Sequence, residues 1–412
     1  MTTPPRIESS LNVLAAEKEQ SFAALSVCLD LSPSHGGAYR AVVDLARAVA
    51  SPILSFQDGT GRLPCEELPL PLCCVDMKTA SQWRRFARLS SRQTLVATAA
   101  AQSPALVFCH SLFRSHNDWV RRFCLQHGVP YIAIPHGSLD PWVFQNKRLR
   151  KACWMSAFGR QYCREAQLML FATESEKRKA EQTLGFVPPA AVIPWPVNAL
   201  TALPTHQEQT AARQRLGLPL DRRMLLFFGR YHSMKRPLET ARAFLDTNLP
   251  DAMLVMAGFD GDVTAEQLRR LNWPKQDRLH VLGPLLGESR TDLFVAADAF
   301  ISWSYRENFC YSAAESLGFG RAVILSPGND LCGELRAKEC GWFPVDDSLE
   351  SLSQTLRAFA ALPRDRLAAM GEAGRLAAQK QFSQTSFHAK LREIISTIRE
   401  TKPTKHRSRS TY

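Results

Sequence analysis

Short apolar runs rich in β-forming residues alternate with helical stretches along most of the chain, and this alternation limits the possible folds more than any other feature. The expected strands of the first half are residues 25–29, 106–109, 131–134, 168–172 and 191–193. Helical patterns lie between them at residues 38–50, 117–127 and 174–184. Continuous apolar strands that alternate with helices predict a parallel sheet covered by helices on both faces.

The same pattern begins again after a Pro-rich, weakly patterned stretch at residues 194–221. The second set of expected strands is residues 224–228, 253–257, 279–282, 299–302 and 322–325, with helices at 236–246, 289–297 and 312–317. A chain of 412 residues also exceeds the roughly 250–300 residues that one hydrophobic core serves. We therefore predict an α/β protein with two doubly wound, Rossmann-like domains, whose parallel sheets face a central cleft.

The net charge of +12 and the pI of about 9.3 suit nucleic acid, an anionic membrane surface or an anionic substrate. One basic cluster, residues 147–151 with Arg160 and Arg164, lies on an expected helix, and another lies at residues 402–409. Two interpretations stay open: a solvated helix face with a frayed tail, or contact with anionic lipid. Nucleic acid is not expected, because the sequence has no zinc-finger spacing and no RNP-like aromatic strand.

No segment approaches the roughly 18–20 consecutive apolar residues of a membrane span, and the N-terminus lacks the basic-then-apolar pattern of a signal peptide. The eleven cysteines include no C-x-x-C pair, and Cys73 and Cys74 are adjacent, which favours reduced, mostly buried thiols. We therefore expect a cytoplasmic protein, peripheral on the inner face of the cytoplasmic membrane if its basic helix contacts lipid.

The clearest motif is R-E-N-F-C-Y-S-A-A-E at residues 306–315, in which Glu307 and Glu315 are separated by seven residues. The segment reads as a strand end, a turn and a helix start, so we expect Glu307 in the loop and Glu315 inside the helix. The loop carboxylate can bind sugar hydroxyls, the first helical amides favour a phosphate, and the inner carboxylate can accept both ribose hydroxyls. Taken alone, the pair could equally be a capping and a solvated glutamate.

A second loop, F-F-G-R-Y-H-S-M-K-R-P, follows the first strand of the second domain and places Arg230 five residues before Lys235. Gly229 permits a tight turn, and two cations on one short loop can neutralise a diphosphate leaving group. Fixed cations stabilise the transition state more than the ground state as charge builds up on that group. The alternative is a pair of solvated surface cations.

Two loops of the first domain complete the set. Gly36 and Gly37 follow its first strand and let the backbone approach a ligand at a helix N-terminus, although a plain turn would also use them. His136 follows the strand at 131–134, within P-H-G-S-L-D-P-W. At the end of a strand in an α/β cleft, either ring nitrogen can hydrogen-bond a sugar hydroxyl; the alternative is a histidine without a ligand.

Together these loops and their order resemble those of the GT-B fold retaining glycosyltransferases of family 4, over about residues 25–399. The run A-T-E-S-E at 172–176 resembles the family's strand-to-helix junction, and H-V-L-G-P-L-L at 280–286 resembles the strand and loop that hold the nucleotide base.

The sequence departs from the family's pattern at two places. E-N-F-C replaces the common E-G-F-G, which is a mild change because Asn tolerates left-handed backbone, and Trp195-Pro196 replaces the usual Asn-Gly turn, which puts the interdomain loop in doubt.

The resemblance implies a role for each motif in binding a nucleoside-diphosphate sugar. Arg230 and Lys235 would bind the diphosphate, Glu315 the ribose, and the backbone of residues 283–285 the base. Glu307 and the two amides after it would hold the donor sugar, which His136 would also contact. Gly37 would lie against the diphosphate or the acceptor. The expected donor-binding residues are Gly36, Gly37, Gly229, Arg230, Lys235, Gly283, Pro284, Leu285, Glu307, Asn308, Phe309 and Glu315; the expected catalytic residues are His136, Glu307, Arg230 and Lys235.

The mechanism that the resemblance implies passes through an oxocarbenium-like transition state, in which the acceptor hydroxyl attacks the face that the diphosphate leaves. The leaving phosphate itself would take the acceptor proton. No side chain is an obvious covalent nucleophile, and no metal or cofactor is expected, because Arg230 and Lys235 supply the countercharge. The sequence D-G-D at 260–262 reads as a turn. The implied acceptor is a glycan or a lipid-linked glycan of surface polysaccharide, lipopolysaccharide or exopolysaccharide biosynthesis.

The expected organisation is residues 1–20 as a flexible N-terminal arm, 21–200 as an acceptor-side domain, 201–220 as a linker, 221–383 as a nucleotide-sugar-binding domain, 384–400 as a helix that crosses back to the first domain, and 401–412 as a basic tail.

Two alternatives stay open: a nucleotide-sugar epimerase on the same fold, and a catalytically silent nucleotide-sugar-binding subunit of a polysaccharide-assembly complex. A dinucleotide dehydrogenase is excluded because no G-x-G-x-x-G follows an expected strand, and an ATPase because there is no Walker A loop.

Overall fold

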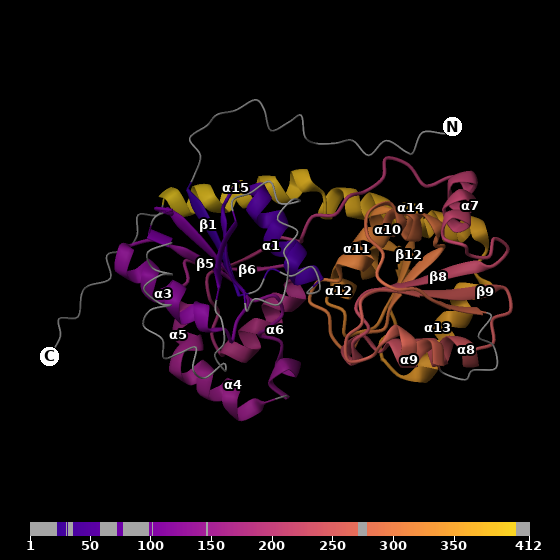
Figure 1. Cartoon of the computed structure of the whole chain (residues 1–412), viewed down its shortest axis with the longest axis horizontal. Helices are drawn as coiled ribbons and strands as arrows, with labels where there is room; N and C mark the ends of the chain where they lie inside the picture. The colour runs from indigo at the N-terminus through magenta and orange to yellow at the C-terminus, as the bar shows by residue number, and fades with distance from the viewer. Residues whose placement is uncertain are drawn as a thin grey trace.

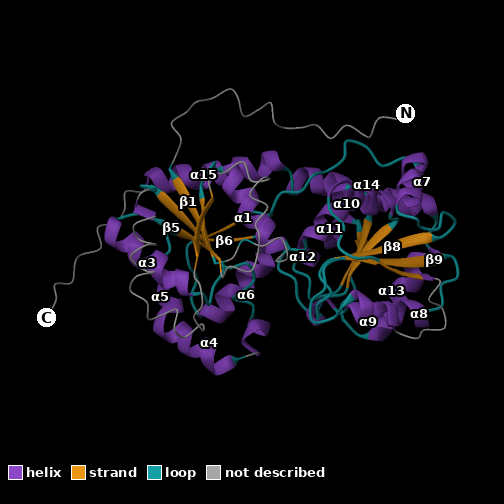
Figure 2. Cartoon of the chain, in the orientation of Figure 1, coloured by secondary structure: helices purple, strands orange, loops and turns teal. Residues whose placement is uncertain are grey.

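The protein consists of two lobes that lie side by side, each built around one sheet (Figure 1). The computed structural model describes residues 23–29, 31, 36–57, 72–76, 99–100, 102–145, 147–270 and 278–400. The predicted arm at 1–20 and the predicted basic tail at 401–412 lie outside these residues. Helices cover both faces of each sheet, as Figure 2 shows, which confirms the predicted pair of doubly wound α/β sheets.

The first sheet has seven parallel strands in the order β3-β2-β1-β4-β5-β6-β7. Its strands are β1 (Ala24–Cys28), β2 (Ile53–Gln57), β3 (Leu72–Asp76), β4 (Leu106–His110), β5 (Tyr131–Ile134), β6 (Leu168–Phe171) and β7 (Ala190–Val192). The helical segments are α1 (Gly37–Ala48), α3 (Ser115–His127), η4 (Pro141–Gln145), α4 (Arg148–Trp154), the π-helical turn η5 (Met155–Gly159), α5 (Arg160–Glu165) and α6 (Glu174–Leu184). The sequence analysis missed β2 and β3, since I-L-S-F-Q and L-C-C-V-D are short and end in polar residues.

The second sheet has six parallel strands in the order β10-β9-β8-β11-β12-β13. Its strands are β8 (Arg223–Phe228), β9 (Ala252–Ala257), β10 (Leu279–Val281), β11 (Ala299–Ser302), β12 (Ala322–Leu325) and β13 (Gly341–Trp342). The helical segments are α7 (His206–Arg215), η6 (Ser233–Lys235), α8 (Pro237–Asp246), α9 (Ala265–Arg270), α10 (Gly287–Ala296), α11 (Tyr311–Gly318), α12 (Leu331–Leu335), η8 (Arg336–Lys338), α13 (Leu349–Ala361), α14 (Arg364–Gln381) and α15 (Gln384–Glu400). The sequence analysis did not predict the two-residue strand β13.

The strand orders decide where a ligand can bind. In each sheet the order reverses between two neighbouring strands, β1 and β4 in the first and β8 and β11 in the second. Loops that leave adjacent strands in opposite directions open a crevice at the carboxyl edge of such a sheet. The glycine pair at 36–37 follows β1, and the loops that carry Lys235 and Glu307 follow β8 and β11. The fold therefore brings three of the predicted motifs to the two crevices.

The segment 201–220, predicted as a linker, contains helix α7. Thr205 and Glu208 form a capping box at its start, a signal that is visible in the sequence as T-x-x-E. Arg213, on this helix, is buried and forms an ion pair of 2.7 Å with Asp298 of the second domain. Helix α7 therefore packs as part of the second lobe.

Helix α15 returns along one side of the molecule to the first lobe (Figure 1). Phe387, Leu391 and Ile395 are buried in the cluster that also contains Ile132 and Leu45 of the first domain. None of the helices in the described ranges is long and apolar enough to cross a lipid bilayer.

Candidate active site

A cavity of about 410 Å³ lies between the two domains, and loops of both domains line it. Twelve of the thirteen predicted site residues line this cavity: Gly36, Gly37, His136, Gly229, Arg230, Lys235, Pro284, Leu285, Glu307, Asn308, Phe309 and Glu315. The thirteenth, Gly283, does not line it, and its carbonyl accepts a hydrogen bond of 3.3 Å from the amide of Gly258. The structure therefore brings together motifs that lie up to 279 residues apart in the sequence, from Gly36 to Glu315.

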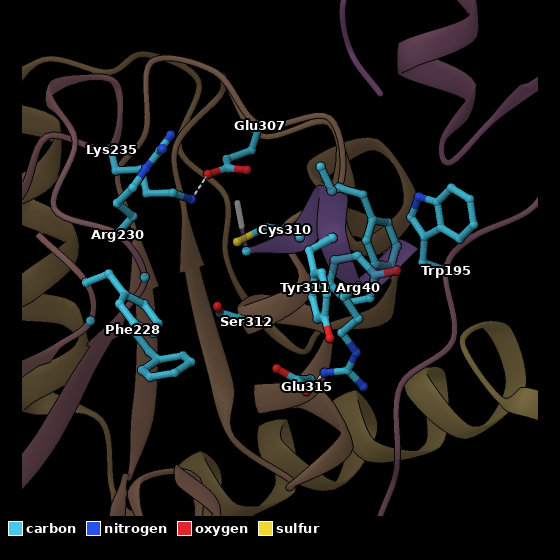
Figure 3. Close-up of a pocket in the computed structure, with 18 of the residues that line it drawn as sticks. Arg40, Trp195, Phe228, Arg230, Lys235, Glu307, Cys310, Tyr311, Ser312 and Glu315 are labelled. Atoms are coloured by element: carbon cyan, nitrogen blue, oxygen red, sulfur yellow. Dashed lines mark hydrogen bonds and ion pairs between the residues drawn. The ribbon is translucent and has the colours of Figure 1, made fainter. Parts of the chain in front are cut away.

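Lys235 and Glu307 form an ion pair on one side of this cavity (Figure 3). Burial lowers the pKa of Lys235, but the Glu307 carboxylate more than offsets this effect, so the pKa lies above its ordinary value. The Glu307 backbone is held on both sides, because its amide donates to the Gly328 carbonyl at 2.9 Å and its carbonyl accepts from the Asp330 amide at 2.8 Å. Arg230 is exposed and has no ion-pair partner among the described residues. One of the two cations is therefore neutralised and the other is available.

Glu315 lies deeper in the cavity, with both carboxylate oxygens taken by guanidinium groups. Arg40 of helix α1 reaches it from the first domain (Figure 3), and Arg290 of helix α10 reaches it from the second. Burial raises the pKa of Glu315, but the Arg40 and Arg290 charges outweigh burial and hold this pKa below its ordinary value. A carboxylate that stays charged at this depth can accept two hydroxyl hydrogen bonds.

Sequence reasoning missed Arg40 and Arg290. Arg290 lies beside two aromatic rings, 5.4 Å from the Phe228 ring centre and 5.3 Å from that of Phe294. Arg40 lies 5.2 Å from the ring centre of Tyr311. A single arginine in a helix has no motif, but Arg40 follows Gly37 by three residues, and this closeness to the glycine pair is a signal that could have identified it.

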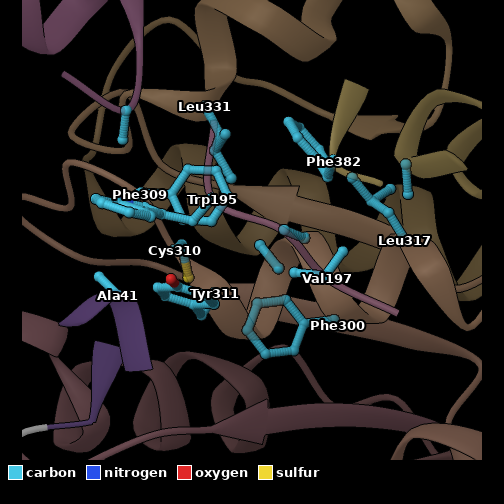
Figure 4. Packing of buried hydrophobic residues seen from close by; sticks show 14 of the residues in the cluster. Ala41, Trp195, Val197, Phe300, Phe309, Cys310, Tyr311, Leu317, Leu331 and Phe382 are labelled. Atoms are coloured by element: carbon cyan, nitrogen blue, oxygen red, sulfur yellow. The ribbon is translucent and has the colours of Figure 1, made fainter. Parts of the chain in front are cut away.

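His136 lies at the first-domain side of the cavity with a left-handed backbone, at φ 49°. Its Nε2 atom is 2.9 Å from Nδ1 of His110, and its ring stacks on Trp195 with the ring centres 5.6 Å apart. Burial lowers the pKa of His136 to about 4, so the ring is neutral at pH 7. Trp195 belongs to the buried cluster between the domains that Figure 4 shows.

The tautomer of His136 follows from the surroundings of His110. The Nε2 atom of His110 is buried and has no hydrogen-bond partner in the described structure. Because a buried N–H without an acceptor is rarer than a buried acceptor without a donor, we assign the His110 proton to Nδ1. His110 then donates to His136, whose own proton must be on Nδ1. His136 can therefore offer one N–H donor to a ligand.

The loop of His136 is fixed from both domains. Glu176 accepts a hydrogen bond of 2.5 Å from the Gly137 amide, and Arg306 donates one of 2.5 Å to the Gly137 carbonyl. Burial raises the pKa of Glu176 to about 7. Gly137 has φ 71°, and a Cβ atom there would lie 2.9 Å from Cβ of Asn308, so only glycine fits this contact.

A charged network also joins the domains beside this loop. Lys179 of the first domain contacts Asp140 at 2.9 Å and Asp330 of the second domain at 2.7 Å. Arg306 of the second domain lies 3.5 Å from Asp140. Burial raises the pKa of Asp330 to about 6. These contacts hold the two domains against each other at the level of the His136 loop.

The chain matches two protein families, one in each half. Residues 208–377 match the glycosyl transferases group 1, and residues 36–198 match the glycosyl transferase 4-like domain. The chain belongs to the group 1 glycosyltransferases. The two matches and the shared fold confirm the family and the GT-B fold predicted from the sequence.

Among curated proteins, the D-inositol 3-phosphate glycosyltransferase of Xylanimonas cellulosilytica is 34% identical over 121 residues, which are 28% of this chain and 28% of the relative. That of Mycobacterium tuberculosis strain F11 is 30% identical over 165 residues, 39% of this chain and 34% of the relative. The glycosyltransferase thus spans about a third of the length of these curated relatives.

Solved structures match over nearly the whole chain. Anabaena HepE in complex with UDP and glucose has a TM-score of 0.75 at 17% identity, covering 91% of this chain and 100% of that chain. Sucrose-phosphate synthase from Thermosynechococcus elongatus also has a TM-score of 0.75 at 17% identity, covering 92% and 99% of the two chains. At such identity these matches show the shared fold alone.

Proposed function

We propose that this glycosyltransferase moves a sugar from a nucleoside-diphosphate sugar to a hydroxyl of a glycan or lipid-linked acceptor, with retention of the anomeric configuration. The observation that carries the proposal is the convergence of two cations, Arg230 and Lys235, and two carboxylates, Glu307 and Glu315, on one cavity between the domains. HepE, which shares the fold, has been solved with UDP and with UDP-glucose, which supports a UDP-sugar as the first donor to test.

Donor binding would exchange ion pairs on the second-domain side of the cavity. Lys235, which is paired with Glu307, would turn to the diphosphate, and Glu307 would then accept the hydroxyls of the donor sugar. Arg230 has no such pair to break among the described residues. Two fixed cations at the diphosphate stabilise the charge that develops on it as the sugar leaves. In this proposal they supply the countercharge without a metal ion or another cofactor.

Ribose binding would involve both domains. Each carboxylate oxygen of Glu315 accepts from one guanidinium group and keeps a second lone pair, so ribose hydroxyls would compete with an arginine for this carboxylate. Arg40 is the partner from the first domain, and its release from Glu315 would free a cation at the cavity wall next to the glycine pair. Arg290 is held by two aromatic rings and would keep the carboxylate charged.

His136 would donate its Nδ1 proton to a hydroxyl of the transferred sugar. Its pKa of about 4 keeps the ring uncharged, so it adds no positive charge beside an oxocarbenium-like transition state. In the proposed reaction, the bond from the anomeric carbon to the phosphate oxygen breaks, and the acceptor oxygen bonds to the same face. The leaving phosphate takes the acceptor proton. Cys310, which also lines the cavity, is a poor covalent nucleophile because burial raises the pKa of its thiol.

The proposed setting is the assembly of surface polysaccharide, lipopolysaccharide or exopolysaccharide on the cytoplasmic side of a membrane. The exposed basic side chains of helix α4 support a peripheral place on that membrane. The proposed domains are residues 21–200 on the acceptor side and 221–383 on the donor side. The proposed diphosphate, ribose and base contacts fall in the second domain, except for those of the glycine pair at 36–37.

The test is a transfer assay with UDP-sugars and glycan acceptors, with the product analysed by NMR for its anomeric configuration. We expect an α-linked donor to give an α-linked product, and Lys235→Ala to abolish transfer while Lys390→Ala, an exposed lysine on α15, does not. An inverted product would contradict retention. A free epimer without glycoside would instead indicate an epimerase, and a thermal shift with UDP, GDP or ADP without any sugar transfer would indicate a catalytically silent subunit.

A further inference from the structure

A second cavity, of about 360 Å³, opens on the first domain away from the donor site. It lies between the segment that runs from η4 to α5 and the C-terminal half of α6, and it shares no lining residue with the donor cavity. Pro141, Phe144 and Met155 form its apolar part, and Arg148 and Arg160 lie at its edge. The cavity therefore combines hydrocarbon surface with two guanidinium groups.

Arg148 and Arg160 are both exposed, and neither side chain has a hydrogen bond or an ion pair within the described ranges. Residues 147–164 contain six lysines and arginines and no aspartate or glutamate. Three of the six have contacts within the protein: Lys151 donates to the Val143 carbonyl and lies 5.9 Å from the ring centre of Phe113, Arg164 lies 4.7 Å from that of Phe186, and Arg150 also has a partner. No carboxylate of this segment neutralises the arginines at the cavity, so they can bind an external anion.

The chemistry of the cavity identifies the anion. A guanidinium group matches the geometry of phosphate oxygens, and two of them favour a phosphate over a single carboxylate. The apolar part of the cavity favours an anion that is attached to hydrocarbon. Leu149, between Arg148 and Arg150, has 82% of its surface exposed. Segments that combine exposed cations with an exposed apolar side chain are typical of surfaces that lie in the interface of an anionic bilayer.

We propose that the surface formed by Lys147, Arg148, Leu149, Arg150 and Arg160 docks on an anionic lipid bilayer, with the phosphate of one phospholipid headgroup in the cavity between Arg148 and Arg160. Leu149 enters the boundary between headgroups and acyl chains. Helix α4 lies on the side of the first lobe opposite to α15 (Figure 1), so the bilayer contacts the α4 side. Pro141 in this cavity is five residues from His136 in the donor cavity, so docking brings the membrane close to the loop that faces the acceptor.

The test is co-sedimentation of the full chain with vesicles made of equal parts of phosphatidylcholine and phosphatidylglycerol. Each arginine near an anionic surface strengthens binding about fivefold, so R148A/R160A should bind roughly thirtyfold more weakly. The matched control is K380A/K390A, which removes two exposed lysines from α14 and α15 and should change binding less than about fivefold in total. Binding of the unmodified protein should weaken steeply with salt and be absent with phosphatidylcholine alone.

Equal loss of binding in the two double variants would overturn the proposal, since it would reveal only a response to net charge. Binding that ignores salt or phosphatidylglycerol would overturn it as well. A thermal-shift measurement with inorganic phosphate distinguishes the sources of the anion. If the unmodified protein shows a shift that R148A/R160A lacks, but does not bind vesicles, the cavity binds free phosphate and the membrane contact is refuted. A UDP thermal shift in each variant checks the fold and the donor site separately, so a failure of the proposed transfer function would be seen independently.

Discussion

The ion pair between Lys235 and Glu307 predicts that removing Glu307 raises the affinity for a nucleotide, whereas removing Lys235 lowers it. The side chains of Lys235 and Glu307 are 22% and 12% exposed, so the pair is intermediate between surface and buried pairs. Two unit charges about 4 Å apart attract by about 4 kcal/mol at an effective dielectric constant of 20. Hydration of the two charges offsets most of this attraction when the pair separates. We take a net value of about 1–2 kcal/mol.

In Glu307→Ala, UDP no longer has to separate this pair, so its affinity should rise about 5- to 30-fold. In Lys235→Ala the diphosphate loses a charge-assisted hydrogen bond worth about 1.5–3 kcal/mol, and UDP should bind about 10- to 150-fold more weakly. Both variants should lose sugar transfer, because each lacks a group that the donor requires.

Isothermal titration calorimetry with UDP at pH 7 measures both effects, and Lys390→Ala serves as a matched control for the loss of a lysine. The double variant K235A/E307A completes a thermodynamic cycle that isolates the pair. If Glu307→Ala weakens UDP binding as much as Lys235→Ala does, the pair must stay intact in the complex and the proposed exchange of partners is wrong.

Three further predictions concern the first domain and its junction. Trp195→Ala should lower the free energy of unfolding by about 3–5 kcal/mol, seen as a lower thermal midpoint, because Trp195 is 2% exposed; an unchanged midpoint would exclude a packing role. Gly137→Ala should abolish transfer, since its Cβ atom would lie 2.9 Å from Asn308 at a left-handed φ of 71°, and normal turnover would refute the close contact. The pKa of His116 is lowered by burial to about 4, so His116 stabilises the fold above pH 6.5 and this stability is lost as the pH falls to 4. In urea titrations between pH 6.5 and 4, the free energy of unfolding of His116→Gln, which keeps a side-chain donor, should fall by about 3 kcal/mol less than that of the unmodified protein; an unchanged pH dependence would refute this role of His116.

The sequence predicted the site best where local spacing and strand position coincide. Arg230 and Lys235 follow one strand and Glu307 follows the neighbouring one, so sheet topology alone brings them together. Arg40 and Arg290 could not be predicted in this way, because their contacts with Glu315 join three helices and depend on how the two domains meet. Such contacts have no periodic pattern.

The same distinction applies to the fold. Strands β8 and β9 were predicted because a strand that is buried on both faces requires a continuous apolar run, and both have one. Strands β2 and β3 escaped prediction because I-L-S-F-Q and L-C-C-V-D are short and end in polar residues. Helix α7 escaped because its apolar residues are few, although its capping box was visible. The roles proposed for the site residues stay predictions until donor binding is measured.

The return of helix α15 to the first lobe has a consequence for biosynthesis. Domains usually fold one after another as the chain emerges from the ribosome, the N-terminal one first. Here Phe387, Leu391 and Ile395 complete a hydrophobic cluster that includes Leu45 and Ile132, more than 250 residues earlier in the chain. The first lobe therefore keeps part of its apolar surface uncovered while the second is still being translated. A nascent chain of this protein presents a binding surface for chaperones until α15 emerges.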